Sequence, residues 1–176
     1  KARWGKFPGP AGAKAPLRVA MDKDAYAAIT AHAAESLDAE ICGILAGTLC
    51  EDDKGYFLQV SASVRGDAAR KGGTHVTFTH ETWDAIHNTM EKEHPKLDIV
   101  GWYHSHPGFG VEFSEMDLFI QKNFFAANTQ VALVTDPLGG QTAMCLQTDN
   151  GVKYISRFWV DGREMKCQMP AGGSSK

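Results

Sequence analysis

The sequence predicts a single layered domain of the α/β or α+β class, with a mixed, mostly antiparallel β-sheet flanked by helices. Its 176 residues are enough for one domain with a full hydrophobic core. Short apolar segments typical of strands are interspersed with stretches whose apolar residues recur at helical spacing. The composition, 43% hydrophobic and 22% charged, is that of an ordinary folded domain.

In the first half of the chain we expect a short strand at 17–20, an amphipathic helix over 23–37, and a hairpin of strands at 41–47 and 56–64. The run 41–47 is continuously apolar and bounded by glycine, as in a buried strand. Glu40 immediately precedes this run, so its carboxylate is expected at the mouth of a core strand. The glycine-containing segment 65–74 is expected to be a loop.

In the second half we expect strands at 75–79, 97–106, 130–135, 143–147 and 152–160, and helices after Thr79 and over 114–125. Thr79 can cap the first of these helices, and Pro95 should end it. Met116, Ile120 and Phe124 are spaced as one apolar face of the second helix. Asn150-Gly151 is a hairpin turn signal.

The two ends of the chain differ from the rest in composition. We expect residues 1–16 to be a flexible basic arm, 17–165 one folded domain, and 166–176 a loose tail rich in glycine and serine. No apolar run approaches the roughly 20 residues of a membrane span, and the net charge of -3 gives no general attraction to nucleic acid. The four cysteines are widely spaced without a C-x-x-C pair, which fits a reducing cytoplasm.

A possible metal site lies at the end of the strand expected at 97–106. Alternate side chains of a strand point to the same side, so His104 and His106 can share a metal while Ser105 faces away. Eleven residues further on, Asp117 falls in the first turn of the following helix. Two imidazoles and one carboxylate suit zinc, and three protein ligands leave a fourth position open for water, as in catalytic sites.

Hydrolysis also requires groups that move protons and stabilise charge. Zinc lowers the pKa of bound water to about 7, and Glu40 could take that proton and deliver it to a leaving amine, if its strand neighbours the histidine strand. Ser114 could donate a hydrogen bond to the oxyanion of the tetrahedral intermediate.

Each of these signals also has a simpler interpretation. Ser114 and Asp117 fit an ordinary helix capping box, and paired histidines at a strand end are often only solvated. A second metal site is conceivable on the helix after Thr79, where one face carries several potential ligands, namely His80, Asp84, His87 and His94. The hypothesis of a catalytic zinc site therefore depends on the conjunction of its members.

The segment 101–110, followed by Ser114 and Asp117, resembles the JAMM (MPN+) metalloprotease motif, H-x-H-P-x6-S-x2-D. Glu40, with the pattern of glycine and leucine that follows it, matches the upstream glutamate segment of the same family, and the resemblance extends from about 17 to 160. It implies an MPN fold, similar to cytidine deaminases, with one catalytic Zn2+ held by His104, His106 and Asp117. It also implies Glu40 as acid/base and Ser114 as oxyanion support.

The resemblance implies cleavage of the bond between the C-terminus of ubiquitin or a ubiquitin-like protein and a lysine or peptide, with possible partner subunits. Two alternatives stay open: a prokaryotic peptidase that processes a sulfur-carrier or other small β-grasp protein, and a noncatalytic partner-binding module that retains metal. Compared with the family, the segment 65–75 is short, and no histidine follows His106 to hold a second zinc. The segment 111–113 also departs from the family pattern.

Overall fold

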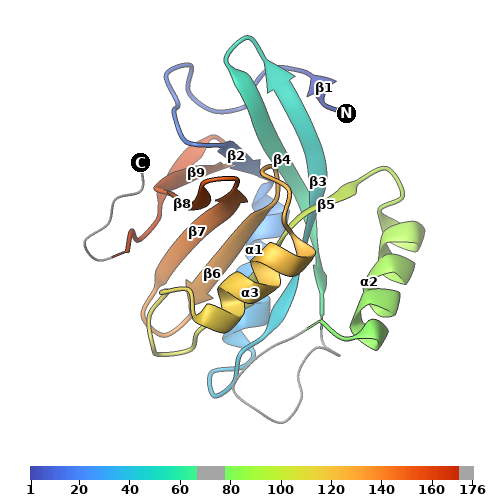
Figure 1. Cartoon of the computed structure of the whole chain (residues 1–176), viewed down its shortest axis with the longest axis vertical. Helices are drawn as coiled ribbons and strands as arrows, with labels where there is room; N and C mark the ends of the chain where they lie inside the picture. The colour runs from blue at the N-terminus through green and yellow to red at the C-terminus, as the bar shows by residue number, and fades with distance from the viewer. Residues whose placement is uncertain (67–77, 171–176) are drawn as a thin grey trace.

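The computed structural model describes residues 1–66 and 78–170, which form three helices and one mixed sheet (Figure 1). The helices are α1 (Lys23–Ala34), α2 (His80–Glu93) and α3 (Glu115–Phe124). The strands are β1 (Arg3–Trp4), β2 (Arg18–Met21), β3 (Cys42–Asp52), β4 (Gly55–Arg65), β5 (Asp98–Ser105), β6 (Val131–Asp136), β7 (Gln141–Thr148), β8 (Gly151–Ile155), β9 (Arg157–Val160) and β10 (Arg163–Lys166).

The strands of the sheet follow the order β10-β9-β2-β4-β3-β5-β6-β7-β8, and β1 pairs with β3. Hairpin partners such as β3 and β4 or β6 and β7 are antiparallel, as are β3 and β5. The pairs β2 with β4, β2 with β9 and β5 with β6 are parallel. The prediction of a mixed sheet flanked by helices is confirmed.

Helices cover both faces of the curled sheet (Figure 1). Because side chains alternate along a strand, neighbouring residues of β5 enter different clusters: Tyr103 packs with Ile29 of α1, and Trp102 packs with Ile86 of α2 and Ile120 of α3. The domain therefore has three layers, with α1 on one face and α2 and α3 on the other.

The central strand β5 depends on a glycine. A Cβ built at Gly101 would lie 2.1 Å from the backbone oxygen of Val131 in β6. Opposite Gly101, the pairing of β3 with β5 shifts register between Leu45 and Ala46. Only glycine allows β5 to lie this close to β6. The end of β5 is therefore held between β3 and β6, next to the start of α3.

The N-terminal segment lies against the sheet, unlike the free arm expected for residues 1–16. Arg3 and Trp4 pair with β3, and Phe7 is only 5% exposed. The ring of Phe7 meets Phe57 and Trp159 edge to face, at centroid distances of 5.2 and 5.4 Å. Burial of this one aromatic ring attaches a segment whose composition otherwise indicates a loop; the domain boundaries themselves stay predictions.

Two further expectations about strands differ from the structure. The strand expected at 152–160 is two strands: after Ser156 the chain leaves β7 and β8, and β9 pairs in parallel with β2. The strand β10 was not expected. Most of the loop expected at 65–74 and of the strand expected at 75–79 falls outside the described residues, but Phe78 and Thr79 form no strand, and Thr79 caps α2.

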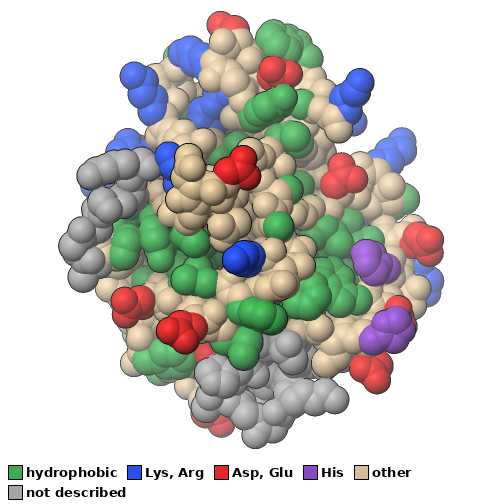
Figure 2. Space-filling model, in the orientation of Figure 1, with side chains coloured by type: hydrophobic (Ala, Val, Ile, Leu, Met, Phe, Trp, Pro, Cys, Tyr) green, Lys and Arg blue, Asp and Glu red, His purple; other side chains and the backbone are tan. Residues whose placement is uncertain are grey.

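The predicted apolar face of α3 is correct at Ile120 but wrong at its other two positions. Met116 and Phe124 are 43% and 41% exposed, whereas the residues that α3 buries are Asp117, Ile120 and Gln121. Figure 2 shows hydrophobic side chains at the surface over α3. The helix turns polar side chains inward because they have partners on β5, described below. None of the helices in the described residues is long and apolar enough to cross a membrane.

Candidate metal centre

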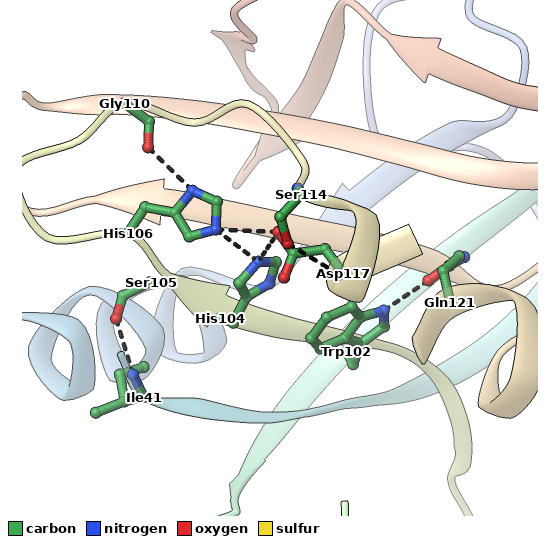
Figure 3. Close-up of polar contacts among 9 residues, drawn as sticks. All are labelled: Ile41, Trp102, His104, Ser105, His106, Gly110, Ser114, Asp117 and Gln121. Carbon is green, nitrogen blue, oxygen red and sulfur yellow. Dashed lines mark hydrogen bonds and ion pairs between the residues drawn. The ribbon is translucent and has the colours of Figure 1, made fainter. Parts of the chain in front are cut away.

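The end of β5 presents two histidines to one side of the sheet (Figure 3). Between them, Ser105 faces the other way, and its Oγ accepts a hydrogen bond from the backbone N–H of Ile41 at 2.9 Å. The backbone N–H of Ser105 donates to the carbonyl of Ile41 at 3.0 Å. The alternation expected from the H-x-H pattern is therefore present, and β5 is fixed to the segment that enters β3.

The third member of the centre comes from the first turn of α3. Ser114 caps the helix: its Oγ accepts from the backbone N–H of Asp117 at 3.0 Å, and its own N–H donates to Asp117 Oδ2 at 2.8 Å. The capping box is thus real, and it does not exclude a metal site. The oxygen that completes it is also the one that faces both histidines, and an ionised carboxylate oxygen has lone pairs for both contacts.

Three ligand atoms converge at the centre. His104 Nε2, His106 Nε2 and Asp117 Oδ2 lie 3.1 Å from one another in every pair. A tetrahedral ion with ligands at about 2.0–2.1 Å would have them roughly 3.3 Å apart. The nitrogen, nitrogen and oxygen donors and their spacing therefore fit zinc with little adjustment.

The orientation of His106 also favours a cation. Its Nδ1 lies 3.2 Å from the carbonyl oxygen of Gly110, which can only accept, so Nδ1 carries the proton in the neutral ring. Nε2 then points a lone pair at a carboxylate oxygen of Asp117. Two acceptors facing each other repel, and a metal ion between them would remove the conflict.

Burial and charge select the ionisation states that a metal needs. His104 is fully buried, and its ring stacks on Trp102 at a centroid distance of 4.5 Å. Desolvation lowers the pKa of His104 despite the opposing effect of Asp117. The lowered pKa favours the neutral imidazole. Burial by itself would raise the pKa of Asp117, but the opposing contributions, among them the hydrogen bond from the Ser114 N–H, hold it well below its usual range.

A pair of residues that the sequence interpretation missed attaches α3 to β5. Trp102 donates its indole N–H to Gln121 Oε1 at 2.6 Å, and Gln121 Nε2 donates to the carbonyl of Gln130 at 3.0 Å. Gln121 lies one helical turn after Asp117 on the same face of α3. The signal that could have identified it was this i, i+4 spacing from a predicted ligand.

Glu40 lies beside this centre in the sheet. Cys42 pairs with His104, and Ile41 bonds to Ser105, so the continued antiparallel register sets Glu40 opposite His106. Directly opposite residues have Cα atoms about 4.5–5.5 Å apart, and their side chains share a face. Glu40 is 7% exposed, whereas Ser114 is only partly buried. The structure therefore brings His104, His106, Ser114 and Asp117 together, and the strand register places Glu40 on the neighbouring segment.

The structure supports the rival metal site on α2 less well. His80 and Asp84 lie 3.5 Å apart but are 89% and 64% exposed. Across residues 1–66 and 78–170, the one group of three or more histidine, cysteine or acidic side chains close enough to share an ion is His104, His106 and Asp117. The candidate metal site is therefore the one at the end of β5.

The fold and the site together define a layered α/β domain with a buried two-histidine, one-aspartate candidate metal centre. Comparison with known proteins identifies its family. Residues 14–130 match the family described as JAB1/Mov34/MPN/PAD-1 ubiquitin protease, so the chain belongs to this family.

Relatives and a solved structure agree with this assignment. The chain is 31% identical over 109 residues to ubiquitin carboxyl-terminal hydrolase RPN11 of Saccharomyces cerevisiae. The match covers 61% of this chain and 34% of that protein. It is 34% identical over 113 residues to 26S proteasome non-ATPase regulatory subunit 14 of Dictyostelium discoideum, with the same coverage. The chain thus matches about a third of the length of these relatives. A solution structure of a Desulfitobacterium hafniense protein has the same fold, with a TM-score of 0.63 and 19% identity over 81% of this chain and 92% of that one.

Proposed function

We propose that this chain is a zinc-dependent isopeptidase or peptidase that hydrolyses the bond between the C-terminus of ubiquitin, or of a ubiquitin-like protein, and a lysine or peptide. The main support is the triangle of His104 Nε2, His106 Nε2 and Asp117 Oδ2, 3.1 Å on each side. Three such ligands suit a catalytic rather than a structural zinc, because one coordination position stays open.

In this proposal each polar group has one role. Zinc, when bound, supplies Lewis acidity, which polarises a carbonyl and makes water a stronger acid near neutral pH. Glu40 accepts the proton of the attacking water and delivers it to the leaving amine. Ser114 donates its hydroxyl hydrogen to the developing oxyanion, because its oxygen already accepts the N–H of Asp117 and the hydrogen remains available.

The substrate and partners are proposed from the relatives. One relative is named as a ubiquitin carboxyl-terminal hydrolase and another as a regulatory subunit of the 26S proteasome. We therefore propose a ubiquitin or ubiquitin-like conjugate as substrate and a partner subunit for this chain, in a cytoplasmic setting. A sulfur-carrier peptidase and a noncatalytic module are the alternatives that the experiment below must separate.

The test combines metal analysis with cleavage. Wild-type protein loaded with zinc is expected to bind one ion per chain and to cleave a ubiquitin-like fusion or isopeptide conjugate, and a chelator should abolish the cleavage. His104→Ala and Asp117→Ala are each expected to lose zinc, because each removes one of three ligands. The measurements are metal content after gel filtration and product formation on a panel of ubiquitin, ubiquitin-like and sulfur-carrier substrates.

His80→Ala is the matched control, because His80 is an exposed histidine from the rival site on α2. It should bind zinc like the wild type. Undiminished zinc in both ligand variants would refute the ligand assignment. Stoichiometric zinc without cleavage of any substrate in the panel would favour the noncatalytic module, and cleavage restricted to sulfur-carrier fusions would favour the other alternative.

A further inference from the structure

A buried carboxylate outside the proposed ligand set connects two loops near the metal centre. Asp136 ends β6 and is 2% exposed. Its Oδ1 accepts the backbone N–H groups of Gly108, Leu138 and Gly139 at 2.8, 3.0 and 3.0 Å, and its Oδ2 accepts that of Gly110 at 3.0 Å. One side chain therefore satisfies four backbone donors.

Only half of these bonds belong to an ordinary turn. An aspartate commonly accepts N–H groups two and three residues ahead, which accounts for Leu138 and Gly139. The bonds to Gly108 and Gly110 instead span 28 and 26 residues and reach the loop between β5 and α3. Burial alone would raise the pKa of Asp136, but the four donors lower it to about 2, so the carboxylate is ionised at neutral pH.

The same loop orients His106. The carbonyl of Gly110 faces His106 Nδ1 at 3.2 Å, and the N–H of Gly110 is bonded to Asp136. The backbone N–H of His106 donates to the carbonyl of Thr135, the residue before Asp136. Gly110 has φ = 82°, which glycine adopts readily. Because glycine is also flexible, contacts from outside the loop help to hold its carbonyl in place.

We infer that Asp136 is a positioning residue for metal binding: by holding the loop 108–110, it aims the Gly110 carbonyl at His106 Nδ1 and thereby directs His106 Nε2 toward Asp117. Asp136 touches neither the ligand atoms nor the substrate in this role. The inference rests on the proposed zinc site for its consequence, but the orientation of His106 can be tested without metal.

The test uses the whole chain with Asp136→Asn and Asp136→Ala. The asparagine can keep one oxygen toward Gly108, Leu138 and Gly139, but it presents an NH2 group to the N–H of Gly110. The alanine removes all four acceptors. Loss of a group that orients a metal ligand typically weakens metal affinity about 10–100-fold. We expect zinc affinity, measured by competition with a chromogenic chelator, to fall in the order wild type, Asp136→Asn, Asp136→Ala.

The second readout is the tautomer of His106 in metal-free protein, measured by long-range proton–nitrogen NMR and assigned with His106→Gln. Wild type should carry the proton on Nδ1, and both Asp136 variants should shift toward a mixture. Asp52→Asn is the matched control, because Asp52 also accepts a backbone N–H two residues ahead and makes a partly buried ion pair with Arg18. It should lose thermal stability but keep the tautomer and the zinc affinity.

An unchanged His106 tautomer in both Asp136 variants would overturn the inference, whatever the protein does with zinc. So would an equal loss of zinc affinity in Asp52→Asn, because the effect would then reflect stability alone. If wild type binds no zinc, the proposed function fails, and the tautomer measurement alone decides the role of Asp136.

Discussion

The two imidazoles of the candidate metal centre are oriented by different kinds of contact. His106 is fixed through a hydrogen bond of Nδ1 to the Gly110 carbonyl, whereas His104 is fixed by stacking on Trp102 with an interplanar angle of 9°. Within the described part of the chain, His104 Nδ1 has no hydrogen-bond partner. The position of His104 therefore depends on packing, whereas His106, which also stacks on Phe109 at a centroid distance of 4.7 Å, has a hydrogen bond to the loop in addition.

At this scale the first prediction concerns Glu40. Glu40→Gln removes a proton acceptor while it preserves the volume of the side chain and leaves the three proposed ligands in place. Turnover of a cleavable conjugate should fall by about 10²–10⁴-fold, the usual contribution of general acid–base catalysis. Zinc content and thermal stability should stay near the wild-type values. A zinc-free Glu40→Gln protein would contradict the division between ligands and acid/base.

The helix α3 positions the proposed ligand Asp117 through contacts in the turn before it and in the turn after it. Ser114 fixes the start of the helix by the capping box, and Gln121 fixes the next turn through the indole of Trp102. Ile120 between them packs into the core, and the ring of Phe124 contacts Trp83 of α2. The helix is therefore oriented by polar contacts on its buried face together with apolar packing.

The second prediction tests this attachment. Gln121→Met keeps the length of the side chain but leaves the indole N–H of Trp102 and the carbonyl of Gln130 without their partner. Each buried group left unsatisfied costs about 1–3 kcal/mol, so the free energy of unfolding in urea should fall by at least about 1 kcal/mol. Zinc affinity should also fall, because Asp117 lies on the same face.

Asn123→Ala is the control within the same helix, since Asn123 makes an exposed side-chain hydrogen bond to Phe119. It should change the free energy of unfolding by no more than about 0.5 kcal/mol. Equal losses of stability and zinc affinity in the two variants would show that Gln121 has no special role in seating the helix.

The third prediction concerns the ion pair between β2 and the end of β3. Hydrogen bonds from Arg18 hold the pKa of Asp52 well below its ordinary value of 3.8. A carboxylate whose pKa is lower in the folded state stabilises the fold fully above its unfolded pKa. This contribution declines below the unfolded pKa and is lost as pH falls through the folded pKa. Asp52→Asn should therefore lower Tm at pH 7, and the difference from wild type should shrink below about pH 4. A Tm difference that is the same at pH 3 and pH 7 would exclude this linkage.

On the scale of the whole molecule, the two ends of the chain complete one side of the sheet. Phe7 packs against Phe57 of β4 and Trp159 of β9, and the guanidinium carbon of Arg18 lies 4.9 Å from the centroid of the Phe7 ring. The strand β9 joins this cluster because it pairs with β2. This region is built from different residues than the metal centre at the end of β5.

The fourth prediction follows from that separation. Phe7→Ala removes a buried ring and should lower the free energy of unfolding by about 3–5 kcal/mol, the usual range for such a change in a core. Zinc affinity should stay within about twofold, because the ring contacts of Phe7 are remote in the sheet from β5. Denaturant unfolding and chelator competition measure the two quantities. A large loss of zinc affinity at temperatures where the variant is folded would show that the two regions are coupled.

Much of the fold and the composition of the candidate site could be predicted from local sequence patterns. Alternation along β5 places His104 and His106 on one side, and the spacing from Ser114 to Asp117 defines a helix start. These patterns involve residues two or three positions apart, which one strand or one helical turn brings together. The mixed layered fold and the family were confirmed, while the roles of the five site residues stay proposals.

Contacts between distant segments were decided only by the tertiary structure. The sequence did not indicate that Phe7 joins the core, that β9 crosses to β2, or that Asp136 reaches a loop 26 residues before it. It also placed Met116 and Phe124 on the buried face of α3 beside Ile120, because apolar spacing favoured them over Gln121. The local sequence specifies what each segment can form, but the partner of a side chain depends on which strands lie side by side, and only the folded sheet determines that.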